Sequence, residues 1–300
     1  MTRQRLYNRD MYEKTGQRKY QDQSDLSKVV INSIYGFLGA SGLLFNWING
    51  AEKVTAEGRK IITQAMDWSK AKGFNLINVD TDSITITNNT HLSIEERDTL
   101  LKELNNQFPK EIVFSHDGYF QDVIVVAAKN YVLHDPTNPK PKKRFIIKGS
   151  SLKSPTLEAA LREFMVEIFW SIIHQQNNFS DIYHKYAKEI NNIKDIKRWA
   201  TRKTVTDKTL NSERTNESKI RDAISGSEYT EGSRIWTFFR SDDSIDLIEN
   251  FKGDYNKMRL YEKLFKVACR FDKLFNVKEL CPNFKLRKNQ KLLDTVLSYI

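Results

Sequence analysis

The sequence predicts an α+β protein in which an antiparallel sheet with packed helices is followed by a mostly helical lobe. Three observations predict this order. Apolar residues recur at helical spacing up to about residue 72, short alternating apolar stretches dominate residues 74–148, and long helical stripes rich in Leu, Ile, Phe and Trp follow residue 155. This change of pattern places a boundary between two lobes near residue 150.

Each predicted element follows from its apolar spacing and from the residues at its ends. Ser93-Ile94-Glu95-Glu96 has the spacing of a capping box, which begins a helix. Gly36 and Gly39 end the first helix, and Asp80-Thr81-Asp82 is typical of a hairpin turn between two strands. The predicted elements, in chain order, are helices over 25–35 and 51–72, strands over 74–79 and 83–87, a helix over 94–107, strands over 112–114, 123–128, 131–133 and 145–147, and helices over 156–175, 181–200, 243–251 and 257–275.

Composition excludes several classes of protein. The longest apolar run, Val123 to Ala128, is far shorter than the roughly 20 residues that a membrane-spanning helix needs, so we expect no membrane span. No apolar stretch follows the basic start of the chain, which argues against a secretory signal. The two cysteines, Cys269 and Cys281, form no Cys-x-x-Cys pair, so neither a disulfide framework nor a zinc ribbon is supported. We therefore expect a reducing, cytoplasmic location.

The charge points to a polyanionic partner. Lys and Arg number 48 against 38 Asp and Glu, giving a net charge of +10 and a pI near 9.3. The excess is concentrated in two stretches: residues 129–153 hold seven basic residues and one acid, and residues 194–221 hold nine and four. A single basic run is usually a solvated face. Two runs that account for the whole excess favour nucleic acid.

The tetrapeptide Asp80-Thr81-Asp82-Ser83 places two carboxylates at one turn, where they repel each other. Exposure to water or a hard divalent cation bound through carboxylate oxygens would relieve the repulsion. The alternative is an ordinary turn, because Asp favours turns by itself.

Lys28, Asn32 and Tyr35 are spaced so that they share one face of a helix. This combination suits a nucleotide: the ammonium group can bind a phosphate, the amide can hydrogen-bond to phosphate, sugar or base, and the ring can stack. The alternative is a helix whose polar face is simply hydrated.

Together these residues resemble family B DNA polymerases. Lys28-x-x-x-Asn32-Ser33-x-Tyr35-Gly36 is similar to motif B of the fingers, and Asp80-Thr81-Asp82-Ser83 to motif C of the palm. Val54-Thr55-x-x-Gly58-Arg59 resembles the palm helix between them, Lys129-Asn130-Tyr131 the Lys-x-Tyr strand, and Lys148-Gly149 a Lys-Gly element before the thumb. The resemblance covers roughly residues 5–155. It implies the end of the fingers over 1–45, the palm over 46–150 and a helical thumb over 151–300.

The resemblance also implies roles for the hairpin and the helix. The reaction would be nucleotidyl transfer from a dNTP to a primer 3′-hydroxyl on primer–template DNA. Asp82 would bind two catalytic Mg²⁺ ions, with Asp80 beside it as a supporting carboxylate. Lys28 would neutralise the departing pyrophosphate, Asn32 would line the incoming nucleotide, and Tyr35 would contact the nascent base pair on its minor-groove side.

Other basic residues would complete the binding surfaces. Arg5 and Arg9 lie four residues apart and would grip the triphosphate. A second set would hold the duplex through phosphate and sugar contacts, which carry no sequence information. This set is Lys129, Tyr131, Lys148, Gly149 and Lys153.

The chain departs from the family pattern in two respects. It has no Asp-x-x-Ser-Leu-Tyr-Pro motif, which supplies the first palm aspartate, and no Asp-Ile-Glu exonuclease signature. We therefore expect the C-terminal part of a polymerase, either a fragment or the product of a split gene whose partner polypeptide carries the exonuclease and the other aspartate. The initial Met favours the split gene. The Lys-, Asn- and Ile-rich composition indicates an AT-rich genome, and we expect that of a phage or virus.

Two other functions stay open. The chain could be a non-catalytic DNA-binding accessory protein derived from a palm and thumb, or a palm enzyme that uses or makes RNA, although Thr81 separates the two aspartates that such palms tend to pair directly. Asp117 could be an auxiliary palm carboxylate or a turn residue. Residues 203–233 could form a DNA-gripping loop or be disordered. Residues 292–300 could dock on a sliding clamp or form a terminal packing helix.

Overall fold

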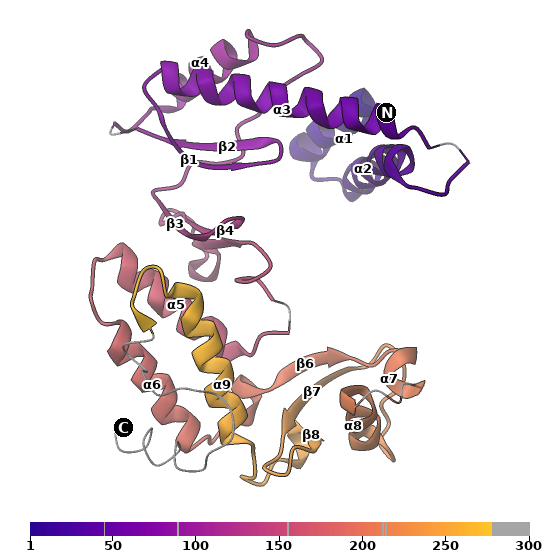
Figure 1. Ribbon diagram of the computed structural model, residues 1–300, viewed down its shortest axis with the longest axis vertical. Coiled ribbons are helices and arrows are strands. Elements are labelled where there is room, and N and C mark those ends of the chain that lie inside the picture. The colour runs from indigo at the N-terminus through magenta and orange to yellow at the C-terminus, as the bar shows by residue number, and fades with distance from the viewer. Residues whose placement is uncertain (45, 89, 155, 212, 214, 278–300) are drawn as a thin grey trace. The chain divides into compact units, whose positions relative to one another are not determined.

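The structure is a computed structural model that describes residues 1–44, 46–88, 90–154, 156–211, 213 and 215–277. Its mixture of helices and small antiparallel sheets confirms the predicted α+β class. The chain divides into two compact units between Asp117 and Gly118 (Figure 1). The predicted functional boundaries at 45 and 150 stay predictions. Among the described helices, none has the length and the apolar content needed to cross a membrane.

The first unit begins with a helical hairpin. α1 (Thr2–Thr15) and α2 (Arg18–Gly39) are joined at Gly16, whose φ of 65° and hydrogen bond to the Tyr12 carbonyl end α1. α2 is longer than predicted at both ends and continues through Gly36, since an interior glycine costs only about 1 kcal/mol and does not by itself break a helix. The helix ends at Gly39, the second of the two glycines predicted to close it.

A two-stranded hairpin packs against the next helix, α3 (Ile48–Ala71). β1 (Asn75–Asp80) and β2 (Ser83–Thr87) are antiparallel, and Asp80 pairs with Ser83 at the tip. The strand that starts just after α3 must run back along it. At a rise of about 3.3 Å per residue, β1 is about 20 Å long. The tip of the hairpin therefore lies about that far from the start of β1, toward the N-terminal half of α3.

The capping box before α4 (Ile94–Asn105) is confirmed. Ser93 Oγ accepts from the Glu96 backbone N–H at 3.2 Å, and the Ser93 N–H donates to Glu96 Oε2 at 2.7 Å. The strand predicted over 112–114 is wrong. The Asn105 side chain instead satisfies both backbone groups of Phe114, at 2.7 and 3.0 Å, and so takes the place of a neighbouring strand.

The second unit starts with a three-stranded antiparallel sheet. β3 (Asp122–Ala127), β4 (Asn130–His134) and β5 (Phe145–Lys148) follow one another, with a 3₁₀ helix over Pro141–Lys143 before β5. The side chains on one face of this sheet join the main core. The pairing of Tyr131 with Lys148 places these two residues on the opposite face.

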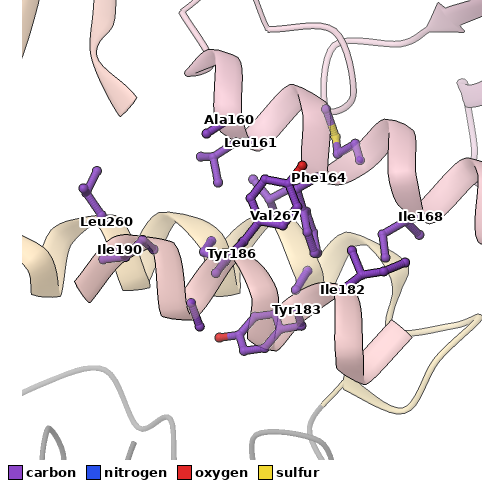
Figure 2. Packing of buried hydrophobic residues seen from close by; sticks show 14 of the residues in the cluster. Ala160, Leu161, Phe164, Ile168, Ile182, Tyr183, Tyr186, Ile190, Leu260 and Val267 are labelled. Atoms are coloured by element: carbon purple, nitrogen blue, oxygen red, sulfur yellow. The ribbon is translucent and has the colours of Figure 1, made fainter. Parts of the chain in front are cut away.

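The main core lies between the sheet and three helices, α5 (Ala159–Ile173), α6 (Phe179–Asn191) and α9 (Lys257–Ala268). Phe164 is fully buried and reaches from α5 toward α6, where its ring centroid lies 5.5 Å from that of Tyr186 (Figure 2). Two of the predicted helices end early. The helix predicted over 181–200 ends with α6 at Asn191, and a 3₁₀ helix follows over Ile196–Trp199. The helix predicted over 257–275 ends with α9 at Ala268, and a 3₁₀ helix follows over Cys269–Phe271.

A separate small core corrects two predictions. β6 (Thr201–Thr204), β7 (Arg234–Phe239) and β8 (Ile245–Leu247) form an antiparallel sheet with α7 (Asp207–Asn211) and α8 (Thr215–Ile224) beside it. The helix predicted over 243–251 is therefore wrong, since β8 and a 3₁₀ helix over Ile248–Asn250 occupy it.

The described part of residues 203–233 is also neither a long loop nor disordered. Ile220 and Ile224, one turn apart on α8, bury themselves against Ile235 and Leu247. This contact orders a segment that is otherwise polar. The tail over 292–300 lies outside the described residues.

Candidate functional site

The predicted carboxylate pair lies at the tip of the β1–β2 hairpin. Asp82 is exposed, and Asp80 is half-buried one residue before the two-residue loop. The loop is closed from inside: the Asp80 carbonyl accepts from the Asp82 N–H at 2.6 Å and from Ser83 Oγ at 3.1 Å. The Thr81 hydroxyl donates to Asp80 Oδ1 at 3.2 Å, which orients the Asp80 carboxylate.

Thr81 has a φ of 55°, which is rare for a β-branched residue. The hydrogen bond from residue 82 back to residue 80 is of the γ-turn type, and a positive φ at its central residue is the strained form. Such strain costs on the order of 1–3 kcal/mol and persists only where the surroundings enforce it. Here the paired strands enforce it, and the result is an exposed Asp82 carboxylate at a sharply bent tip.

The two carboxylates of this tip could supply the protein ligands of a Mg²⁺ ion, but not its whole coordination shell. Mg²⁺ prefers oxygen ligands and is usually bound by one or two protein carboxylates, with substrate phosphates and water completing its shell. The two hairpin carboxylates match that protein contribution. Among the described ranges, no three His, Cys, Asp or Glu side chains are grouped closely enough to hold a metal by themselves.

The helical hairpin carries the predicted phosphate-binding residues on two packed helices. Counting outward equally from the connection between α1 and α2 places Arg5 at the level of Lys28, and Arg9 one helical turn away at the level of Ser24. Asn8 and Ser24 are the buried residues between the two helices. Arg5 and Lys28 are thus equally far along the chain from the connection, on two helices that pack against each other.

Arg5 and Arg9 differ in their exposure to water. The Nε of Arg5 is buried and has no hydrogen-bond partner among the described residues. Arg9 makes a long contact of 3.9 Å with Glu13, both largely exposed, which is worth little in water. Arg5 is thus partly buried, whereas Arg9 is exposed.

Lys28, Asn32 and Tyr35 lie on one exposed face of α2, as predicted. Tyr35 as a whole residue is 44% exposed. Within the described part of the chain, none of the three side chains has a hydrogen bond or an ion pair. Ser33, the neighbour in the same motif, bonds back to the Val29 carbonyl at 2.8 Å and is used within the helix.

The residues predicted to bind the duplex gather in the second unit. Lys148 lies opposite Tyr131 in the β4–β5 register, and Lys129 precedes Asn130 in the β3–β4 turn. Lys129, Lys148 and Lys153 are exposed, and Lys153 donates its N–H to the Gly149 carbonyl at 2.9 Å. Three cations therefore surround one corner of the sheet.

Sequence reasoning missed the residue at the centre of this corner. The Asn130 side chain accepts from the N–H of Ser151 at 3.1 Å and from its hydroxyl, and donates to the Ala128 carbonyl at 2.9 Å. Asn130 lies within the Lys-Asn-Tyr motif, but nothing in the sequence places Ser151 beside it. Asp117 is exposed, and its auxiliary role stays a prediction.

Sequence comparison places the chain among known proteins. Residues 1–221 match the profile of DNA polymerase family B. The chain is 28% identical over 169 residues to a DNA polymerase of Paramecium bursaria Chlorella virus NY2A, which covers 53% of this chain and 18% of that protein. It is 30% identical over 111 residues to DNA polymerase 1 of Pyrococcus abyssi (strain GE5 / Orsay), covering 36% and 14%.

A solved structure shows the same fold. The family B DNA polymerase from the archaeon Pyrobaculum calidifontis superposes with a TM-score of 0.58 at 16% sequence identity, over 90% of this chain and 36% of that one. The chain thus spans less than a fifth of the length of the two curated relatives, and about a third of the solved structure. Because the family profile matches most of its length, this chain belongs to DNA polymerase family B.

Proposed function

We propose that this chain supplies the nucleotide-binding helix, the metal-binding hairpin and the duplex-binding corner of a DNA-directed DNA polymerase. It would be the C-terminal part of that enzyme. The observation that carries the proposal is the exposed Asp82 carboxylate at a strained hairpin tip, within residues that match the family profile. A viral source stays part of the proposal and is supported by the viral relative.

The helical hairpin would hold the incoming nucleotide. Lys28 and Arg5, at one level of α1 and α2, would bind the triphosphate through charge-assisted contacts. Asn32, one turn further along α2, would hydrogen-bond to the nucleotide. Tyr35 would present its exposed ring to the nascent base pair. These side chains lack partners among the described residues, which leaves their hydrogen-bonding capacity for a ligand.

Asp82, with Asp80 beside it, would hold Mg²⁺. The bound metal would act as the Lewis acid for displacement at the α-phosphate by the primer 3′-hydroxyl. The hydrogen bond from Thr81 would keep the Asp80 carboxylate oriented toward the tip. The short loop would keep the Asp82 carboxylate at its end and in water, so its negative charge needs no buried partner.

A polypeptide segment outside this sequence would complete the site with the other palm aspartate and would carry the exonuclease. Two features support this. β1 and β2 pair only with each other among the described residues, and an isolated two-stranded hairpin is marginal in water. Large apolar side chains are also exposed on or beside α2 and α3, where a partner would cover them. They include Leu26, Val29, Phe37, Trp47, Ile48 and Val54.

Primer extension tests the proposal. The chain is mixed with a polypeptide from the same genome that contains an Asp-x-x-Ser-Leu-Tyr-Pro motif, together with primer–template DNA, Mg²⁺ and dNTPs. We expect extension by the mixture, none by either component, and a loss of about 100-fold or more on Asp82→Ala, corresponding to about 2.7 kcal/mol of transition-state stabilisation.

Asp98→Ala is the matched control, because Asp98 is an exposed aspartate of α4 in the same unit. Its extension rate should equal that of the unmodified chain. Normal extension by Asp82→Ala would overturn the assignment of the metal-binding hairpin. Salt-sensitive DNA binding without extension by any mixture would support the accessory DNA-binding protein instead.

A further inference from the structure

One side chain fastens the β3–β4 turn to the loop after β5. Asn130 Oδ1 accepts two hydrogen bonds from Ser151, one from the backbone N–H at 3.1 Å and one from the hydroxyl. Asn130 Nδ2 donates to the Ala128 carbonyl at 2.9 Å, across the turn itself. The amide of Asn130 therefore bridges two segments that are 21 residues apart in the sequence.

The backbone at this junction is unusually close. Gly149 has a φ of 97°, and a Cβ built on it would overlap the Lys129 carbonyl oxygen and Asn130 Oδ1. Lys129 has a φ of 59°, a left-handed conformation that costs roughly 1–2 kcal/mol for a residue with a side chain. The Asn130 amide thus holds the backbone of Gly149 close to that of Lys129, the residue with the strained φ.

This junction determines where two cations lie. Lys129 directly precedes Asn130, and Lys148 directly precedes Gly149. The strands fix Lys148 opposite Tyr131, whereas Lys129 lies in the turn closed by the last β3–β4 pair, Ala127 with Asn130. The position of Lys129 relative to Lys148 therefore depends on the turn, and the turn depends on the Asn130 hydrogen bonds.

We propose that Asn130 is a positioning residue for nucleic-acid binding, which holds Lys129 and Lys148 at a fixed separation so that both contact the same stretch of the phosphate backbone. The inference rests on the proposed function, in which these two lysines bind DNA. A preorganised pair binds more tightly than two independent side chains, because the cost of ordering Lys129 is met within the folded protein. Asn130 itself need not touch the DNA.

A mutant cycle on the full chain tests this. Binding to a fluorescent primer–template duplex is followed by anisotropy from 50 to 300 mM NaCl for the unmodified chain, Asn130→Ala, the double variant Lys129→Ala/Lys148→Ala, and the triple variant. Each phosphate contact contributes about 0.9 to the slope of log K against log salt concentration. We expect Asn130→Ala to weaken binding about 5- to 10-fold at 100 mM NaCl and to reduce the slope by about one.

The triple variant separates positioning from general damage. If Asn130 acts through the lysines, its replacement in the double variant should change binding less than about 2-fold. A matched control is Asn138→Ala. Asn138 also closes a turn with its side chain, accepting from the Lys140 N–H at 3.1 Å, but it lies in the β4–β5 connection at the other end of the strands. Asn138→Ala should bind like the unmodified chain.

The binding results distinguish failure of the DNA-contact assignment from failure of the positioning role of Asn130. If Lys129→Ala/Lys148→Ala binds normally, the assignment of DNA contacts fails, and this inference fails with it. If that variant binds weakly while Asn130→Ala binds normally, only the inference is overturned. An equal loss on replacing Asn130 with and without the lysines also overturns it, because the effect would then be structural. Circular dichroism melting of every variant accompanies the binding curves, so that unfolding is recognised directly.

Discussion

Thr81, at the tip of the candidate site, is a β-branched residue in a backbone conformation that such residues rarely adopt. Its φ of 55° is costly for a β-branched side chain, while its hydroxyl donates to Asp80 Oδ1 at 3.2 Å. Thr81→Gly removes the strain but makes the unfolded chain more flexible, so we expect a net gain of up to about 1 kcal/mol in unfolding free energy. We also expect slower primer extension, since Asp80 loses the hydroxyl that orients it.

Thr81→Val is the comparison that separates these two effects. Valine keeps the branched side chain and its strain but lacks the hydroxyl. It should therefore slow extension like the glycine variant and bring no gain of stability in urea unfolding. Faster extension by Thr81→Gly would show that strain at the tip hinders the reaction, contrary to this expectation.

At the scale of one element, α4 depends on its capping box. The Ser93 hydroxyl accepts from the Glu96 N–H, and the Glu96 carboxylate accepts from the Ser93 N–H. The hydrogen bond from the Ser93 backbone N–H, and to a smaller extent the Ser93 side chain, lower the pKa of the Glu96 carboxyl. Ser93→Ala should reduce the stability of the first unit by about 1 kcal/mol, measured by urea unfolding at pH 7.

Thr99→Ala is the control for this helix. Its hydroxyl only bonds back to the Glu95 carbonyl at 2.8 Å, and the residue is exposed, so the change should stay within about 0.5 kcal/mol. Because its pKa is lower in the folded protein, the Glu96 carboxylate stabilises the fold at pH values above its pKa in the unfolded chain. This contribution should disappear as the pH falls through the folded-state pKa of Glu96. A Ser93→Ala variant as stable as the unmodified chain would contradict the capping role.

At the scale of the whole molecule, the two units differ in how much apolar surface they bury. Within the described ranges, the buried apolar residues of the first unit are Ala51, Ala65, Phe74 and Leu104, whereas the second unit contains both larger clusters. The first unit therefore has little core of its own. Its stability is expected to depend on whatever covers α2 and α3.

The helical bundle of the second unit should be sensitive to alkali. Tyr261 of α9 is buried, and its single hydroxyl hydrogen is shared between two acceptors on α6, the Ala187 carbonyl at 3.1 Å and Asn191 Oδ1 at 2.8 Å. Burial raises the pKa of Tyr261 from 10 to about 12. The folded protein then holds this proton more tightly than the unfolded chain, so the stabilisation is complete below pH 10 and is lost between pH 10 and 12.

Urea unfolding at pH 9 and pH 11.5 measures this loss, which should be on the order of 1–2 kcal/mol. Tyr261→Phe should be less stable at pH 9, because it lacks the hydroxyl that hydrogen-bonds to α6, but should lose less stability on going to pH 11.5. Tyr7→Phe serves as the control, since the Tyr7 ring is exposed in α1. An equal alkaline loss in Tyr261→Phe would mean that other groups cause it. Tyr186 is the first candidate, as its pKa is raised by burial and by Glu167.

Local signals determined much of this protein from the sequence alone. The capping box at Ser93, the hairpin around Asp80-Thr81-Asp82 and the polar face of α2 each depend on residues within one turn or one bend. Such patterns act through short-range hydrogen bonds and steric preferences that remain the same in any context. The family could also be inferred, because the order of its motifs is itself a property of the sequence.

Long-range contacts decided the rest. The segment over 112–114 has the composition of a strand, but the Asn105 amide satisfies Phe114, and no sequence rule foresees that contact. β8 replaced a predicted helix because β7 offers its residues a hydrogen-bonded edge. The Asn130–Ser151 bridge likewise exists only once β4 and β5 are paired. Such contacts stabilise the protein only when segments that are distant in the sequence come together, and the local spacing of residues does not predict which segments do so.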